Sequence, residues 1–351
     1  MATVVPSQSI CSLAVTTTNV EERGLPFVGM DHPLGLSDIT KAATEIGDVI
    51  APTPLFRWPL LDAATGVETW LKHENTTRVG AFKVRGGLTF VSRALSDDPS
   101  ARGFVTATRG NHGQSIAFAA GRHQRCAVIV VPLSNSIEKN AAMRALGAEV
   151  IEAGESYQQS RGVAAQIAQD RGLVMVPPFH PWLLAGVATY ALEMFGQHGE
   201  LDTVYVPIGM GSGAACCVMV RDFLGLATKI VGVVSSHAPA YARSLEQNRV
   251  VEVEAATKLA DGLSCSAPDP DALAILGKGL DRVVQVSDTQ VAQAMRDIFS
   301  ATHHVAEGAG AAAVAGCTHD LVRPAGPTAC ILSGSNVDLD VFANVLDGTW
   351  S

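Results

Sequence analysis

The sequence predicts an α/β protein with two lobes, each an open and mostly parallel sheet flanked by helices. From about residue 67, short β-branched runs alternate with longer amphipathic runs, a pattern typical of parallel strands that helices cover on both faces. The 351 residues, 47% of them hydrophobic, can form one large domain or two modest ones. A net charge of −9 argues against nucleic acid as a partner and favours a small molecule.

Strands are expected where runs rich in Val, Ile, Thr and aromatic residues lie between turn residues. These runs span residues 67–74, 103–107, 126–131, 148–153, 203–209, 229–235, 282–288 and 328–334. Apolar residues at helical spacing predict helices between the strands. The predicted helices span residues 84–95, 115–124, 137–147, 158–170, 214–225, 289–304 and 310–321. The Pro-rich stretch 175–182 interrupts the alternation, and we interpret it as a return from one lobe to the other.

Cysteines and apolar runs indicate the compartment. The seven cysteines are scattered without C-x-x-C spacing, which predicts neither a disulfide framework nor a zinc site and favours a reducing cytoplasm. Residues 1–24 lack the regions of a signal peptide, and no apolar run is long enough to cross a membrane. We expect an unprocessed cytoplasmic protein with a mobile N-terminus, no membrane partner and no regulatory domain after residue 351.

Three loops follow a strand and precede a helix, and parallel sheets bind ligands at the carboxyl ends of their strands. In the first loop, residues 107–115, Gly110 permits a tight turn, and the following helix offers free N–H groups to an anion. The alternative is that Asn111 and His112 form only a turn and a helix cap.

The second loop, residues 207–215, is rich in glycine. Its glycines let backbone N–H groups converge on a phosphate at a helix N-terminus. The loop also matches G-x-G-x-x-A, so a nicotinamide-dependent dehydrogenase is an alternative. That alternative requires an acid at the end of the next strand, where this chain has Val234 and Ser235, so a single phosphate is favoured.

The third loop, residues 332–338, places the Ser333 hydroxyl at a strand end, where it either binds a ligand or only closes a turn. Lys83 lies in the apolar sequence G-A-F-K-V, and a buried lysine needs a chemical reason. Burial lowers the pKa of a lysine and favours the free amine, which can form an imine. Such a lysine, a phosphate cradle, an anion-binding loop and a neutral hydroxyl together favour pyridoxal 5′-phosphate as the cofactor.

Motifs in a fixed order strengthen this interpretation. They are P-T-P-L at 52–55, K-H-E at 72–74, A-F-K-V-R-G at 81–86, T-R-G-N-H-G-Q at 108–114, P-I-G-M-G-S at 207–212, E-G-A-G at 307–310 and S-G-S-N at 333–336. From about residue 35 to the end, the chain resembles the serine/threonine dehydratase family of pyridoxal-phosphate enzymes, which has the tryptophan-synthase-β fold type and includes serine racemase. The resemblance implies a cofactor in the cleft between a discontinuous large cofactor-binding domain, residues 1–76 and 182–351, and a smaller mobile domain, residues 77–181.

The resemblance also implies roles for single residues. Lys83 forms a Schiff base with the cofactor and then acts as acid and base at the substrate Cα, while Phe82 lies along the cofactor. Asn111 donates a hydrogen bond to the 3′-oxygen of the ring, and Ser333 faces the pyridine nitrogen. The phosphate is held by the main chain of Gly209, Met210, Gly211 and Ser212, and the substrate carboxylate by Thr108, Arg109, Gly110, Asn111 and His112.

The implied reaction is β-elimination of water from a β-hydroxy amino acid, which gives a 2-oxo acid and ammonia. The candidate substrates are threonine, serine, 3-hydroxyaspartate and phenylserine. A hydroxyl cannot hold the ring nitrogen protonated as a carboxylate would, so Ser333 favours elimination over transamination. An amino-acid racemase and a β-replacement synthase on the same fold remain alternatives, and the family leads us to expect a homodimer.

Several positions depart from the family pattern. Arg109 stands where racemases carry a serine that acts as a second base, and its permanent charge argues against racemisation. Its side chain either points to solvent, pairs with an acid or binds a distal group of the substrate. Val234 replaces a glutamate of the family's divalent-metal site, so no metal is expected. Met210 and Ser212 replace cradle glycines, and Glu307 either approaches the ring edge or caps a helix.

Overall fold

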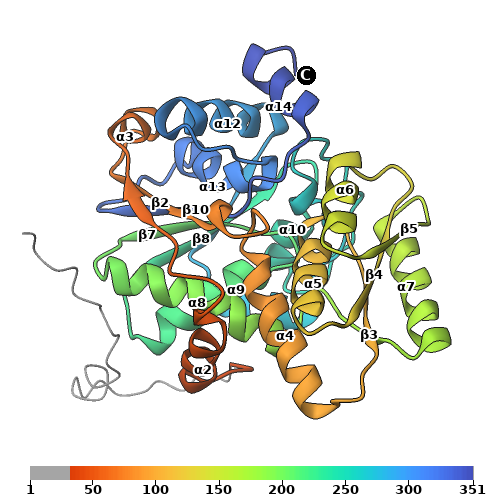
Figure 1. The fold of residues 1–351 in the computed structure, drawn as a ribbon. Helices are drawn as coiled ribbons and strands as arrows, with labels where there is room; N and C mark the ends of the chain where they lie inside the picture. Colours follow the sequence, from red (N-terminus) through yellow and green to blue (C-terminus); the bar gives the residue numbers. More distant parts are fainter. Residues whose placement is uncertain (1–31, 351) are drawn as a thin grey trace, which may run out of the picture. The chain divides into compact units, whose positions relative to one another are not determined.

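Two sheets with helices on their faces form the structure and confirm the predicted α/β fold (Figure 1). The computed structural model describes residues 32–350, so the predictions for the N-terminal stretch, Cys11 included, lie outside the described residues. The first sheet contains, in spatial order, β1 (Leu55–Arg57), β2 (Thr69–His73), β10 (Thr328–Leu332), β7 (Thr203–Pro207), β8 (Lys229–Ser235) and β9 (Arg282–Val286). The second contains β5 (Glu149–Glu152), β4 (Cys126–Val131), β3 (Gly103–Ala107) and β6 (Val174–Met175). Neighbouring strands are parallel except for the pair β1 and β2.

The helices follow the strands along the chain. They are α2 (Leu36–Gly47), α3 (Pro59–Thr65), α4 (Lys83–Asp97), α5 (Asn111–Arg122), α6 (Ile137–Ala145), α7 (Tyr157–Arg171), α8 (Pro181–Gln197), α9 (Ser212–Phe223), α10 (Ala240–Gln247), α11 (Pro270–Gly279), α12 (Asp288–Thr302), α13 (Gly308–His319) and α14 (Leu339–Asp347), with 3₁₀ turns η1 (Glu74–Thr76) and η2 (Asp261–Leu263). The sequence did not predict α8, because most of its side chains are buried and it has no polar stripe to mark a helical period. Within residues 32–350, no helix is long and apolar enough to cross a membrane.

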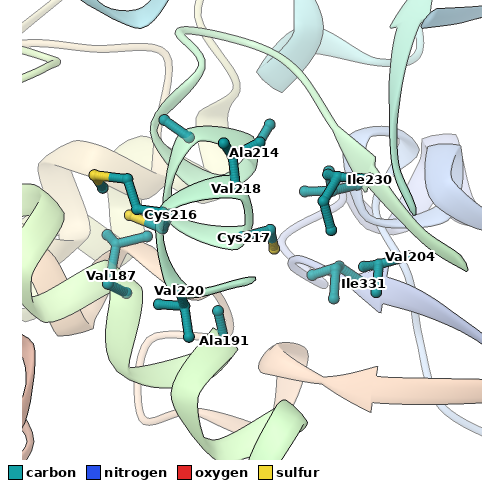
Figure 2. Close-up of a cluster of buried hydrophobic side chains, with 14 of the residues drawn as sticks. Val187, Ala191, Val204, Ala214, Cys216, Cys217, Val218, Val220, Ile230 and Ile331 are labelled. Atoms are coloured by element: carbon teal, nitrogen blue, oxygen red, sulfur yellow. The ribbon is translucent and has the colours of Figure 1, made fainter. Parts of the chain in front are cut away.

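Alternate residues of the first sheet point to opposite faces. Val204 and Ile331 pack against α8 and α9, in the cluster that surrounds Cys217 (Figure 2). Tyr205 and Cys330 pack on the other face, in a cluster with α12 and α13. Because helices cover both faces, these strands are continuous apolar runs, which is why they were recognisable in the sequence.

The second sheet is covered in the same way. Phe104 and Ile129 pack in the cluster that includes α4 and α5, whereas Val105 and Val130 pack against α7. All strands of this sheet lie inside residues 77–181, the range expected for the smaller domain. The domain boundaries and the mobility of that domain stay predictions. The parallel strands bring the three predicted loops to the carboxyl ends of β3, β7 and β10.

Candidate active site

Lys83 is the first residue of α4, and main-chain contacts bring it to the end of β10. The backbone N–H of Phe82 donates to the Ser333 carbonyl oxygen over 3.1 Å, and Ala81 forms a bridge with Gly334. The Ser333 hydroxyl donates to the Ala309 carbonyl oxygen over 3.4 Å. The structure therefore brings together the lysine and serine motifs that the sequence analysis singled out.

The Lys83 amine lies half-buried at the wall of a cavity of about 110 Å³. Its Nζ lies 4.9 Å from the centroid of the Phe82 ring. Burial lowers the pKa of Lys83 to about 8, although the nearby Glu307 and Cys216 act in the opposite direction. About a tenth of the amine is thus uncharged at pH 7, far more than for an ordinary lysine, and this fraction is available as a nucleophile or a base.

This lowered pKa gives a direct prediction for the cofactor-free protein. Only the neutral amine reacts with acetic anhydride, so labelling of Lys83 should rise with pH and reach half its maximum near pH 8. Lysines of the urea-unfolded chain should instead reach half-maximal labelling near pH 10.4, the ordinary value. Mass spectrometry of the labelled peptides measures both midpoints. Equal midpoints in the folded and unfolded chains would contradict the lowered pKa.

The N-terminus of α9 forms a main-chain cradle after β7. Gly211 precedes the helix with a φ of 91°, in the left-handed region, and no acidic residue lies in the first turn. A Cβ on Gly211 would lie 2.8 Å from the Tyr241 hydroxyl, and one on Gly209 would lie 2.1 Å from the Gly262 carbonyl oxygen. The first N–H groups of a helix lack acceptors within the helix and suit an anion. Met210 keeps a negative φ, so its replacement of glycine leaves the main-chain donor in place.

The predicted anion-binding loop connects β3 to α5. Asn111 is the first residue of α5, so the helix begins four residues before the predicted start at 115. The Thr108 hydroxyl accepts hydrogen bonds from the backbone N–H groups of Gly110 over 2.9 Å and Gly113 over 3.4 Å. These contacts fix the loop, so that the helix N-terminus faces the cavity that Lys83 lines.

Asn111 has partners on both sides of its amide. Its Nδ2 donates to Glu307 Oε1 over 2.5 Å, and its Oδ1 accepts from Asn336 Nδ2 over 2.8 Å. An asparagine amide carries two N–H donors, so one donor of Asn111 remains for a ligand. Glu307 of the E-G-A-G motif and Asn336 of the S-G-S-N motif thereby fix the orientation of this side chain.

Glu307 precedes α13 but does not cap it with its side chain. Its buried carboxylate accepts hydrogen bonds from Asn111 and, over 3.4 Å, from Lys139 Nζ. Burial raises the pKa of Glu307, although the Lys139 ammonium opposes this shift. The capping alternative is therefore wrong as far as the side chain is concerned. An approach of Glu307 to the cofactor ring stays a prediction.

Lys139 and Asp261 are site residues that the sequence analysis missed. Lys139 Nζ, from α6, donates to Asp261 Oδ2 over 2.5 Å, and Asp261 begins η2. Burial alone would lower the pKa of Lys139, but the carboxylates of Asp261 and Glu307 outweigh burial and raise it. The position of Lys139 just after β4, the neighbour of β3, was a usable signal. Asp261 lies in an irregular stretch that offered no pattern.

The cavity collects most of the predicted site residues. Those that line it are Lys83, Thr108, Arg109, Gly110, Asn111, His112, Gly209 and Met210. The unpredicted lining residues are Ala107, Lys139, Tyr157, Pro178, Asp261, Gly262, Ser264 and Cys265. The cavity lining does not include Phe82, Gly211, Ser212 and Ser333. Burial, with a smaller contribution from Lys83, lowers the pKa of His112 to about 3, so this histidine is a neutral imidazole.

A buried charge network lies beside the lysine helix. Arg85 Nε donates to Glu74 Oε2 over 2.8 Å, and Arg85 Nη1 donates to Glu193 Oε1 over 2.7 Å. Lys72 Nζ donates to Glu193 Oε2 over 2.9 Å and to the Thr53 carbonyl oxygen over 2.8 Å. The motifs P-T-P-L, K-H-E and A-F-K-V-R-G thus meet in one network. This network connects β2 and α8 to the helix that begins at Lys83. Within residues 32–350, no cluster of His, Cys, Asp and Glu could hold a metal ion.

Comparison with known proteins places this geometry in context. Residues 46–334 match the family model described as pyridoxal-phosphate dependent enzyme. L-threonine ammonia-lyase of Thermotoga maritima is 31% identical over 313 residues, which cover 89% of this chain and 78% of that protein. The processed form of threonine deaminase isoform 2 from Solanum lycopersicum has a TM-score of 0.81 and 27% identity, over 92% of this chain and 95% of that chain. A pyridoxal 5′-phosphate-dependent aspartate racemase has a TM-score of 0.83 and 26% identity, over 89% of this chain and 98% of that chain.

Proposed function

Because this chain belongs to the family of pyridoxal-phosphate dependent enzymes, we propose that it is an ammonia-lyase for β-hydroxy amino acids. The products are a 2-oxo acid and ammonia, and the cofactor is pyridoxal 5′-phosphate. The observation that carries the proposal is the Lys83 amine, with its pKa lowered to about 8, in one cavity with the N-terminal loop of α5. The relative named L-threonine ammonia-lyase supports this reaction class. The family match leaves the nicotinamide alternative without support.

The main chain and three side chains fit this cofactor. When bound, pyridoxal phosphate supplies an aldehyde that bonds to a lysine amine and a ring that draws negative charge from the substrate Cα. Gly209 to Ser212 would hold the phosphate, since the first N–H groups of α9 lack acceptors within the helix and no Cβ fits at Gly209 or Gly211. The free N–H of Asn111 would hold the 3′-oxygen. The Ser333 hydroxyl, which donates to the Ala309 carbonyl oxygen over 3.4 Å, would turn to meet the ring nitrogen. Phe82 would lie along the ring.

The chain's own residues account for the choice of reaction. Lys83 removes the Cα proton, because its amine is available as a base near neutral pH. The loop from Thr108 to His112 binds the substrate carboxylate with the N–H groups at the start of α5. Arg109 cannot serve as a base on the opposite face, because its guanidinium stays charged. Elimination is therefore favoured over racemisation, despite the similarity to an aspartate racemase.

A substrate panel tests the reaction. The purified holoenzyme should release a 2-oxo acid and an equal amount of ammonia from at least one of serine, threonine, 3-hydroxyaspartate and phenylserine. Alanine, which lacks a β-leaving group, is the control and should release neither product. Racemisation without 2-oxo acid, or substitution at Cβ by an added thiol without ammonia release, would establish a racemase or a β-replacement synthase instead.

The assembly and the location of the enzyme belong to the same proposal. We propose a homodimer, which light scattering of the purified protein would distinguish from a monomer. Cytoplasmic location is consistent with the cysteines of residues 32–350, which are all free thiols. Fractionation of cells would test it directly.

A further inference from the structure

Arg109 is a charged side chain of the cavity that lacks a partner. Its Nε is buried and makes no hydrogen bond, and no acid of residues 32–350 lies within ion-pair distance of its guanidinium. A buried guanidinium nitrogen without an acceptor is costly. The sequence left three interpretations of the Arg109 side chain. The structure excludes two of them, because Arg109 neither pairs with a nearby acid nor lies fully in solvent.

Of the other basic groups of the cavity wall, Lys83 is the amine assigned to the reaction, and the remaining two add no unbalanced charge. Lys139 is balanced by Asp261 and Glu307, at 2.5 Å and 3.4 Å. His112 is neutral, so it adds no charge. The permanent positive charge of Arg109 is thus left unbalanced at this wall, and an anionic group of a ligand would balance it.

The place of Arg109 in the loop determines which anion it can reach. Arg109 directly precedes Gly110 and the first residue of α5, where the N–H groups of the helix N-terminus would bind the α-carboxylate. The phosphate cradle, after β7 at the start of α9, also reaches this cavity through Gly209 and Met210, but its own main-chain N–H groups suit the phosphate. An anion at Arg109 is therefore a second group on the substrate, close to its α-carboxylate but distinct from it.

We propose that Arg109 is a specificity-determining residue that binds the distal carboxylate of a β-hydroxy amino dicarboxylic acid. The smallest such substrate is 3-hydroxyaspartate, which loses ammonia to give a four-carbon 2-oxo dicarboxylic acid. The planar guanidinium can donate two parallel hydrogen bonds to that carboxylate. This inference rests on the proposed lyase function for its reaction, and on the geometry of the cavity for its binding site.

Kinetics of Arg109→Gln and Arg109→Lys test the inference. In Arg109→Gln, kcat/KM for 3-hydroxyaspartate should fall about 10- to 100-fold, mainly through KM, because a charged hydrogen-bond pair is lost. The values for serine and threonine should fall much less, so that the ratio of kcat/KM for 3-hydroxyaspartate to that for serine drops about tenfold or more. Arg109→Lys should restore part of the loss, since it keeps the charge without the planar fork. The matched control is Arg102→Gln, because Arg102 is exposed and precedes the same strand, β3.

A binding measurement separates this site from the reaction. Succinate carries two carboxylates but no amine or hydroxyl, so it cannot react. It should raise the melting temperature of the wild-type holoenzyme more than butyrate does, and the difference should vanish in Arg109→Gln. If succinate binds in this way but no 2-oxo acid is ever released, the proposed reaction fails and the anion subsite stands.

Two results would overturn the inference. An equal loss of kcat/KM for serine, threonine and 3-hydroxyaspartate would show that Arg109 binds the α-carboxylate that all three share. Unchanged kinetics together with equal effects of succinate and butyrate would show that Arg109 contacts no substrate group.

Discussion

Lys83→Ala should lower kcat for β-elimination by about 10²–10⁴-fold or more, because the variant loses the base at the substrate Cα. It should also lose covalent attachment of the cofactor. The other lysine that lines the cavity, Lys139, is held as an ammonium by Asp261 and Glu307. Reduction with borohydride followed by mass spectrometry measures the attachment, and 2-oxo acid release measures the rate.

Two controls make this result specific. Lys278→Ala removes an exposed lysine from α11 and should keep both the cofactor label and the rate. Added methylamine should restore part of the rate in Lys83→Ala, because a small amine can occupy the space of the lost side chain. A cofactor label that persists in Lys83→Ala would place the reactive lysine elsewhere and refute the proposed site.

Arg85→Met should lower the free energy of unfolding by about 3–5 kcal/mol, the usual cost of removing one partner from a buried ion pair. Both Arg85 and Glu74 have side chains with 0% exposure. Burial alone would raise the pKa of Glu74, but Arg85 and Lys72 outweigh burial and lower it. Without the guanidinium, Glu74 is left as an uncompensated charge or must take up a proton, and both outcomes destabilise the fold. Equilibrium unfolding in urea, followed by circular dichroism, measures the change.

A double-mutant cycle distinguishes a charge effect from simple loss of packing. Glu74→Gln combined with Arg85→Met removes the uncompensated carboxylate, so the double variant should recover part of the stability that Arg85→Met loses. The surface pair of Arg144 and Glu152 is the matched control, with side chains 49% and 41% exposed. Arg144→Ala should cost no more than about 1 kcal/mol. Equal losses in the free energy of unfolding for Arg85→Met and Arg144→Ala would show that the buried ion pair stabilises the fold no more than the surface pair does.

The fold was largely predictable because its strands and helices carry local signals. β3, β4, β8 and β10 are apolar runs of the lengths that covered parallel strands need, and the structure contains each of them where the sequence indicated. Three of the elements that escaped prediction lack such signals. α8 is buried nearly all round, and β1 and β6 have only three and two residues. A window of sequence records the period of burial, and these three elements show no period. The helices α2, α10 and α14 were also not predicted, although apolar residues recur in them at helical spacing.

The sequence by itself determined the fold class, the cofactor chemistry and the residues of the motifs, because each depends on residue types at short spacing. Only the tertiary structure decided which partners those residues have. Asn111 meets Glu307 across 196 positions of sequence, and Lys139 meets Asp261 across 122. The structure also left Arg109 without an acid partner among residues 32–350. Such pairings follow from the packing of distant elements, which no local pattern records, and they decide which charges of the cavity remain for a substrate.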